Sequence, residues 1–153
     1  MIDGGVQYMK SKGGTFWQDG DTRGMDAWLP GLEPEPRDTL IFKKNPSAFF
    51  GTTLSTELQL MNVDTLVLCG VSTSGCVRAT TLDAMCYGFR PMVSYRFPVQ
   101  MQRKLNFNAI QVVGSACGDR SAIIQSATLF DLHSKYADVV TEEAIEKMKV
   151  GWV

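Results

Sequence analysis

Cys76 is the residue whose sequence neighbours best suit nucleophilic chemistry. It follows a run of small residues at 72–75, which itself follows an apolar run, and the residues after it have helical spacing. A helix N-terminus presents unpaired N–H groups and the positive end of the helix dipole, which favour a thiolate over a thiol. The same N–H groups can hold the oxyanion formed when a thiolate attacks a carbonyl. The position is compatible with a cysteine nucleophile or with a buried cysteine in a strand-to-helix turn.

Cationic side chains are candidates to support such a thiol. Lys43 ends a short apolar run, so in a parallel sheet it would reach the same rim as Cys76. Its ammonium could lower the thiol pKa and polarise a carbonyl, whereas Lys43 and Lys44 could equally be surface charges. Arg120 follows Asp119 in another turn, where its planar guanidinium could clamp a carboxylate or pair with Asp119.

The other cysteines and the single histidine suggest structural roles. Cys69 and Cys86 fall inside a strand and a helix and are predicted to pack, and Cys117 is predicted to lie in a turn. With no Cys-x-x-Cys pair and no secretory signal, a disulfide framework is not expected. His133 has no second histidine to assist it, so we expect it to be structural or solvated rather than a zinc ligand or a triad member.

Composition limits the classes of protein that need consideration. The chain has 153 residues, of which 44% are hydrophobic, which suits one domain of 1–153 with a single core. A net charge of −1 gives no electrostatic reason to expect nucleic acid as a partner. No apolar run approaches the ~18 residues of a membrane helix, and the first residues do not resemble a signal peptide. We therefore expect a cytoplasmic protein with no membrane partner.

Alternating strand and helix patterns must position these side chains. Strands are predicted at 40–42, 65–70, from 90 onward and at 137–140, and helices at 54–61, 76–87, 121–136 and 141–149. The residues expected to share one face are Val77, Thr80, Thr81 and Ala84 in the second helix, and Ile123, Ala127 and Phe130 in the third. Gly88 is expected to end the second helix in the left-handed conformation. The alternation predicts an α/β fold with a mainly parallel sheet, which binds ligands at the C-terminal ends of its strands.

Several runs together resemble the signature of the isochorismatase-like cysteine hydrolases. The strongest is DTLVLCGVSTSGCVRAT at 64–80, and the others are SAFFGT at 47–52, GFRP at 88–91, GDR at 118–120, DL at 131–132 and KYADVV at 135–140. The resemblance covers most of residues 38–93 and 112–148. It is strongest to the N-carbamoylsarcosine amidohydrolase and maleamate amidohydrolase branch.

The resemblance implies a Rossmann-like three-layer α/β/α sandwich that cleaves a C–N bond of a small carboxylate-bearing amide or ureido substrate. The reaction would run through a cysteine thioester and release ammonia, with no cofactor or metal, and the family commonly forms homo-oligomers. Cys76 would be the nucleophile. Lys43 would be the catalytic lysine, because it stands four residues before the Ser-Ala-Phe motif.

The resemblance also assigns residues around the nucleophile. Arg120 and Thr73 would bind substrate. The peptide bond between Val71 and Ser72 would be cis, and the N–H groups of Ser72 and Cys76 would form the oxyanion hole. The rival functions are a catalytically inactive fragment of this fold, and a nicotinamidase-like or redox-thiol protein. The first would follow if the general base were lacking.

The sequence departs from the family pattern at both the start and the middle of the chain. It shows no apolar run followed by Asp-x-Gln, so we expect it to lack the first strand and the catalytic Asp. Residues 1–39 are expected to be an irregular segment in which Phe16 and Trp17 stack on substrate or pack. About nineteen residues, roughly 93–111, intervene before GDR. They are predicted to be a retained intron translated in frame, or else a mobile loop over the rim of the site.

Overall fold

The computed structural model describes residues 28, 30–31, 33–94 and 117–148. The helices are α2 Leu54–Leu60, α3 Arg78–Cys86, α4 Ala122–Lys135 and α5 Glu142–Met148, and a π-helical turn, η1 Thr73–Val77, precedes α3. The strands are β1 Thr65–Leu68, β2 Gly70–Val71, β3 Arg90–Ser94, β4 Cys117–Gly118 and β5 Asp138–Val140. The predictions for Phe16, Trp17 and residues 95–111 of the expected insertion lie outside the described residues.

The strands form parallel pairs, as the alternating pattern predicts. One sheet has the order β1-β3-β5, with Val67 opposite Met92 and Met92 opposite Asp138. A shorter parallel pair joins β2 to β4, with Gly70 opposite Cys117. Within the described residues, β1 pairs with β3 and with no other strand. β2 follows β1 directly in the chain. Its pairing with β4 therefore places the segment after β1 beside the Gly-Asp-Arg turn.

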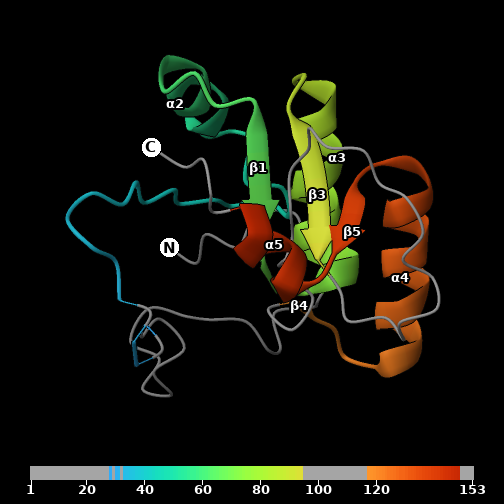
Figure 1. Ribbon diagram of the computed structural model, residues 1–153. Helices are drawn as coiled ribbons and strands as arrows, with labels where there is room; N and C mark the ends of the chain where they lie inside the picture. The colour runs from blue at the N-terminus through green and yellow to red at the C-terminus, as the bar shows by residue number, and fades with distance from the viewer. Residues whose placement is uncertain (1–27, 29, 32, 95–116, 149–153) are drawn as a thin grey trace.

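Helices cover both faces of the sheet. In Figure 1, α5 lies in front of the sheet and α3 lies behind it. One core cluster joins Val140 to Ala144 and Ile145 of α5, and the other joins Val139 to Leu129 and Leu132 of α4. The arrangement is an α/β/α layering with a parallel sheet.

The predicted helices are present, but the second α-helix begins at a later residue than the sequence predicts. Val77, Thr80, Thr81 and Ala84 are all buried, which confirms the predicted face. The first turn of this segment is π-helical, so the α-helix begins at Arg78 rather than at Cys76. Gly88 has a φ of 85° and follows the C-cap, as expected for a residue in the left-handed region.

Two predicted apolar features are wrong. Residues 40–42 form no strand, and Phe42 is 88% exposed, because a strand needs a ladder partner and none of the described strands pairs with this segment. In α4, the predicted stripe of Ile123, Ala127 and Phe130 is exposed, while Leu129 and Leu132 are fully buried. The helix carries a second apolar stripe, and this stripe packs against Val77 and Cys117 on the sheet side.

The environments of three cysteines also differ from the predictions. Cys69 and Cys86 are exposed, and Cys117 is buried within β4 rather than in a turn. Cys69 occupies the break between β1 and β2, where the strand pairing changes from β3 to β4, so it does not share the strand's burial. Cys86 ends α3 on the solvent side. None of the helices in the described ranges combines the length and apolarity needed to cross a bilayer.

Candidate active site

Cys76 lies inside the π-helical turn that follows β2, where its side chain is half-buried. Two N–H groups of the turn share one acceptor, because those of Gly75 and Val77 both donate to the Ser72 carbonyl oxygen, at 3.0 and 3.2 Å. A Cβ at position 75 would lie 2.6 Å from Ser72 Oγ, so a larger residue there would displace the Ser72 side chain. The peptide bond from Val71 to Ser72 is cis. The thiol therefore lies on a short π-helical turn that these two hydrogen bonds hold to Ser72.

The Lys43 ammonium lies against this thiol. Its Nζ is 3.4 Å from Cys76 Sγ and donates to the carbonyls of Asn45 and Pro46, both at 3.1 Å. These carbonyls belong to the loop that directly follows the lysine, so the Lys43 ammonium is hydrogen-bonded to that loop. Lys43 reaches Cys76 as predicted, but from this loop and not from the end of a strand.

The loop after Lys43 is held to α3, which explains how a residue 33 positions before Cys76 is placed beside it. The Ala48 N–H donates to Thr80 Oγ1 at 3.0 Å. Phe49 is 2% exposed and stacks on the rings of Tyr87 and Phe89, with centroids 5.3 and 5.8 Å apart. Burying a phenylalanine of this kind stabilises a structure by roughly 1.5–3 kcal/mol. The Ser-Ala-Phe motif thus anchors the segment that delivers the lysine.

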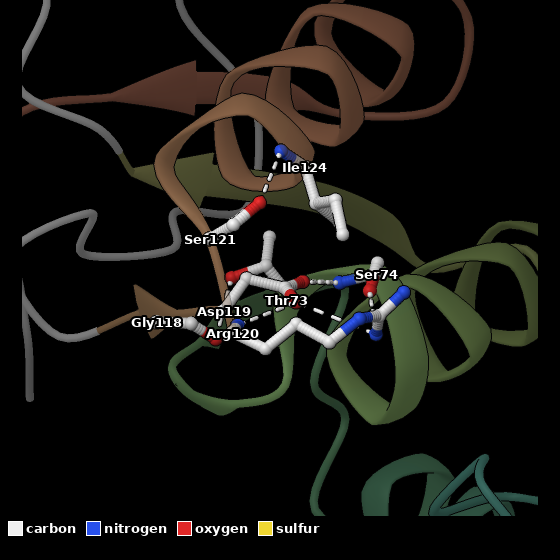
Figure 2. Close-up of polar contacts among 7 residues, drawn as sticks. All are labelled: Thr73, Ser74, Gly118, Asp119, Arg120, Ser121 and Ile124. Carbon is white, nitrogen blue, oxygen red and sulfur yellow. Dashed lines mark hydrogen bonds and ion pairs between the residues drawn. The ribbon is translucent and has the colours of Figure 1, made fainter.

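A second turn, at Gly118–Arg120, is bonded to the nucleophile turn (Figure 2). Thr73 Oγ1 donates to the Gly118 carbonyl at 3.1 Å, and the Ser74 N–H donates to Asp119 Oδ2 at 2.6 Å. Thr73 is fully buried, so its hydroxyl fastens the two turns together. A substrate contact at Thr73, like the oxyanion hole at the Ser72 and Cys76 N–H groups, stays a prediction.

Arg120 extends from this second turn toward the nucleophile turn. Its side chain is 71% exposed, and Nη1 lies 3.7 Å from Asp119 Oδ1 and 3.5 Å from Ser74 Oγ. The guanidinium thus pairs with Asp119, one of the two possibilities that the sequence left open, and it contacts Ser74, which stands two residues before Cys76. A substrate carboxylate on Arg120 stays a prediction. Such a guanidinium can accept a further carboxylate.

Asp119 itself is a site residue that sequence reasoning underrated. Burial works against its charged form, but hydrogen bonds from Ser74 and Arg120 and the charge of Arg120 outweigh it, so the pKa of the carboxyl lies below its ordinary value. The sequence offered only one signal, the acidic residue directly before Arg120. Its contact with Ser74, 45 residues away, leaves no local pattern.

Two other titratable side chains do not suit this chemistry. Burial, the largest cause, raises the pKa of the Cys117 thiol to about 12, which disfavours a thiolate there. His133 is exposed, and its Nδ1 accepts a hydrogen bond from the Val139 N–H at 3.2 Å, which agrees with a structural or solvated residue. All four cysteines are free. Among the described residues, no group of three or more His, Cys, Asp or Glu side chains is arranged to hold a metal ion.

Comparison with known proteins agrees with the fold and with the motifs around this turn. The isochorismatase domain model matches residues 5–144. The chain belongs to the isochorismatase family. Membership explains why the Cys76 turn, the Ser-Ala-Phe loop and the Gly-Asp-Arg turn occur together, and it confirms the resemblance noted from the sequence.

Individual relatives agree with this family assignment. Maleamate amidohydrolase of Pseudomonas putida is 35% identical over 150 residues, which are 97% of this chain and 61% of that protein. N-carbamoylsarcosine amidase of an Arthrobacter species is 28% identical over 131 residues, which are 86% of this chain and 39% of that protein. This chain thus spans about three fifths or less of the length of these relatives.

Solved structures confirm the fold. An isochorismatase-like hydrolase from Alkaliphilus metalliredigens superposes with a TM-score of 0.64 at 23% identity, covering 80% of this chain and 56% of that one. The predicted Rossmann-like α/β architecture is therefore the architecture of the family.

Proposed function

We propose that this chain carries the active site of a cysteine amidohydrolase, which cleaves the C–N bond of a small carboxylate-bearing amide or ureido substrate. The observation that carries the proposal is the 3.4 Å contact between Lys43 Nζ and Cys76 Sγ at the π-helical turn. A cation beside a half-buried thiol favours the thiolate, which is the reactive form. Family membership and the names of its relatives support the same class of reaction.

The proposed reaction uses Cys76 as the nucleophile. The thiol releases its proton, and the thiolate sulfur forms a bond to the amide carbonyl carbon. The C–N bond then breaks as the departing nitrogen takes up a proton and leaves as ammonia. Water then cleaves the thioester, which releases the acid and restores the thiol. The negative oxygen that forms in each step would be held by the N–H groups of Ser72 and Cys76. Lys43 would stabilise the thiolate and polarise the carbonyl.

Arg120 would give the site its preference for a carboxylate. Its guanidinium is exposed, lies at the end of a parallel strand pair and contacts Ser74, which stands two residues before the nucleophile. A planar guanidinium binds a carboxylate through paired N–H donors. A substrate with its carboxylate a few bonds from its amide carbonyl would therefore reach both Arg120 and Cys76.

Ammonia release tests this proposal. Maleamate and N-carbamoylsarcosine carry a carboxylate, and nicotinamide is a neutral comparison. We expect turnover of at least one carboxylate-bearing substrate, its loss in Cys76→Ala, and its retention in Cys69→Ser, a matched change at an exposed cysteine. Equal turnover in the Cys76→Ala variant would remove Cys76 as the nucleophile. A folded chain that releases no ammonia from any of the three would favour the inactive alternative.

A further inference from the structure

Asp119 connects the two turns that carry the chemistry. We propose that Asp119 is a positioning residue, which fixes the nucleophile turn and Arg120 relative to each other so that one substrate can reach both. The inference rests on the proposed function, because it takes Cys76 as the nucleophile and Arg120 as the carboxylate ligand. Asp119 itself would not touch substrate.

The two oxygens of the Asp119 carboxylate accept hydrogen bonds from two segments. One donor lies in η1 and the other is the next residue of the turn that contains Asp119. Oδ2 accepts the Ser74 N–H at 2.6 Å, and Oδ1 accepts the Arg120 N–H at 2.8 Å (Figure 2). The Asp119 side chain has no exposed surface, so water does not compete for these bonds. Hydrogen bonds to an ionised acceptor are about twice as strong as neutral ones. The carboxylate is therefore a rigid bridge between η1 and the residues that follow β4.

The same carboxylate also orients the Arg120 side chain. The guanidinium Nη1 lies 3.7 Å from Oδ1 and 3.5 Å from Ser74 Oγ, so its direction is set by the two residues that the bridge joins. The pairing also offsets the cost of burying a charge, which is high for an unpaired carboxylate. The Asp119 carboxylate thus contacts Arg120 twice, at its backbone N–H and at its guanidinium.

An asparagine could not reproduce this bridge. Its amide oxygen can accept from Ser74, but its amide nitrogen is a donor and would face the Arg120 N–H, which is also a donor. The turns would nevertheless stay joined, because Thr73 Oγ1 donates to the Gly118 carbonyl and β2 pairs with β4 at Gly70 and Val71. We therefore expect Asp119→Asn to fold and to loosen the position of Arg120 relative to Cys76.

Two alkylating probes measure this relation without depending on turnover. Iodoacetate and iodoacetamide both react by forming an S–C bond as iodide leaves, but only iodoacetate carries a carboxylate. Their rates at Cys76 are measured by mass spectrometry with fragmentation, which separates Cys76 from the exposed Cys69. The iodoacetate-to-iodoacetamide ratio should fall about fivefold in Arg120→Ala, a reasonable size for losing one charge-assisted contact at an exposed site. In Asp119→Asn it should fall by at least half that factor.

Asp131→Asn is the matched control. Its carboxylate also pairs with two cations, Arg78 and Lys135, at 2.7 Å each, but it lies on α4 away from the Gly118–Arg120 turn. A purely structural loss lowers the melting temperature and changes both alkylation rates alike, so the ratio at Cys76 should stay at its wild-type value in this variant.

The outcomes separate failure of the inference from failure of the proposed function. A ratio that falls in Arg120→Ala but keeps its wild-type value in folded Asp119→Asn would overturn the positioning role alone. A ratio unchanged in Arg120→Ala would overturn it together with the proposed carboxylate contact. Should Asp119→Asn fail to fold, Asp119→Glu keeps the buried charge but cannot hold both N–H donors at the native distances, and the same fall is expected.

Discussion

Replacing Lys43 by methionine tests the pairing on which the site depends. The substitution keeps most of the aliphatic stem and removes the ammonium that lies 3.4 Å from Cys76 Sγ. At that distance the attraction between unit charges is about 1 kcal/mol in water and about 5 kcal/mol at an effective dielectric of ~20. Lys43 is an exposed residue, so solvent screens it and the lower figure applies.

An attraction of about 1 kcal/mol between the ammonium and a negatively charged sulfur corresponds to roughly a fivefold to tenfold change in the reaction rate, since about 1.4 kcal/mol is a factor of ten. We therefore expect iodoacetamide to alkylate Cys76 about fivefold to tenfold more slowly in Lys43→Met at neutral pH. The fold should persist, because the loop is anchored independently through Phe49 and the Ala48–Thr80 hydrogen bond.

The assay follows alkylation of the Cys76 peptide over time, with Lys44→Met as the matched control. The control removes a neighbouring charge of the same type but leaves the Lys43–Cys76 contact in place, so its rate should be close to wild type. Equal rates in Lys43→Met and wild type would refute the electrostatic reasoning. A slow rate in both lysine variants would show that the general charge of the loop matters, and not this contact.

Other predictions concern the turn, the buried carboxylate and the loop anchor. Gly75→Ala should lower the free energy of unfolding by about 1 kcal/mol in urea titrations, because its Cβ would meet Ser72 Oγ at 2.6 Å, and Ser72→Ala should relieve most of that loss. The pKa of Asp119 is lowered in the folded state, so its stabilisation is present above the ordinary value of 3.8 and is lost as the pH falls through the folded value. Thermal unfolding between pH 2 and 6 should therefore show a shallower pH dependence in Asp119→Asn than in wild type, and an equal slope would contradict this. Phe49→Ala should cost about 3–5 kcal/mol and also slow Cys76 alkylation, because the loop carrying the lysine loses its buried anchor. Normal alkylation in the folded variant would argue against that anchoring.

The helices and parallel strands could be predicted because their signals are local and periodic. The face made by Val77 of η1 with Thr80, Thr81 and Ala84 of α3 is one such case, and it is buried as expected. The stripe of α4 could not be chosen in the same way, since the helix carries two apolar stripes and only contact with the sheet decides between them. Residues 40–42 show a second limit, because an apolar run becomes a strand only where a partner is available.

The residues of the site likewise include some that the sequence could predict and some that it could not. The placement of Cys76 after a strand and a turn could be read from neighbouring residues, and Lys43 could be selected through the motif that follows it. The bridge at Asp119 could not, because the carboxylate meets the Ser74 N–H only after β2 and β4 have paired. The exposure of Cys69 could not be predicted for a related reason. Cys69 lies in the break between β1 and β2, and that break depends on which strands β1 and β2 pair with.

Trapping an acyl-enzyme tests the central claim most directly. The chain is mixed with a carboxylate-bearing amide substrate, quenched in acid within the first turnovers and digested, and the peptides are identified by mass spectrometry. We predict an acyl adduct on Cys76 that disappears as ammonia release ends and that is absent from Cys76→Ala. Steady release of ammonia without any adduct on Cys76, at a rate unchanged in Cys76→Ala, would contradict the proposed mechanism.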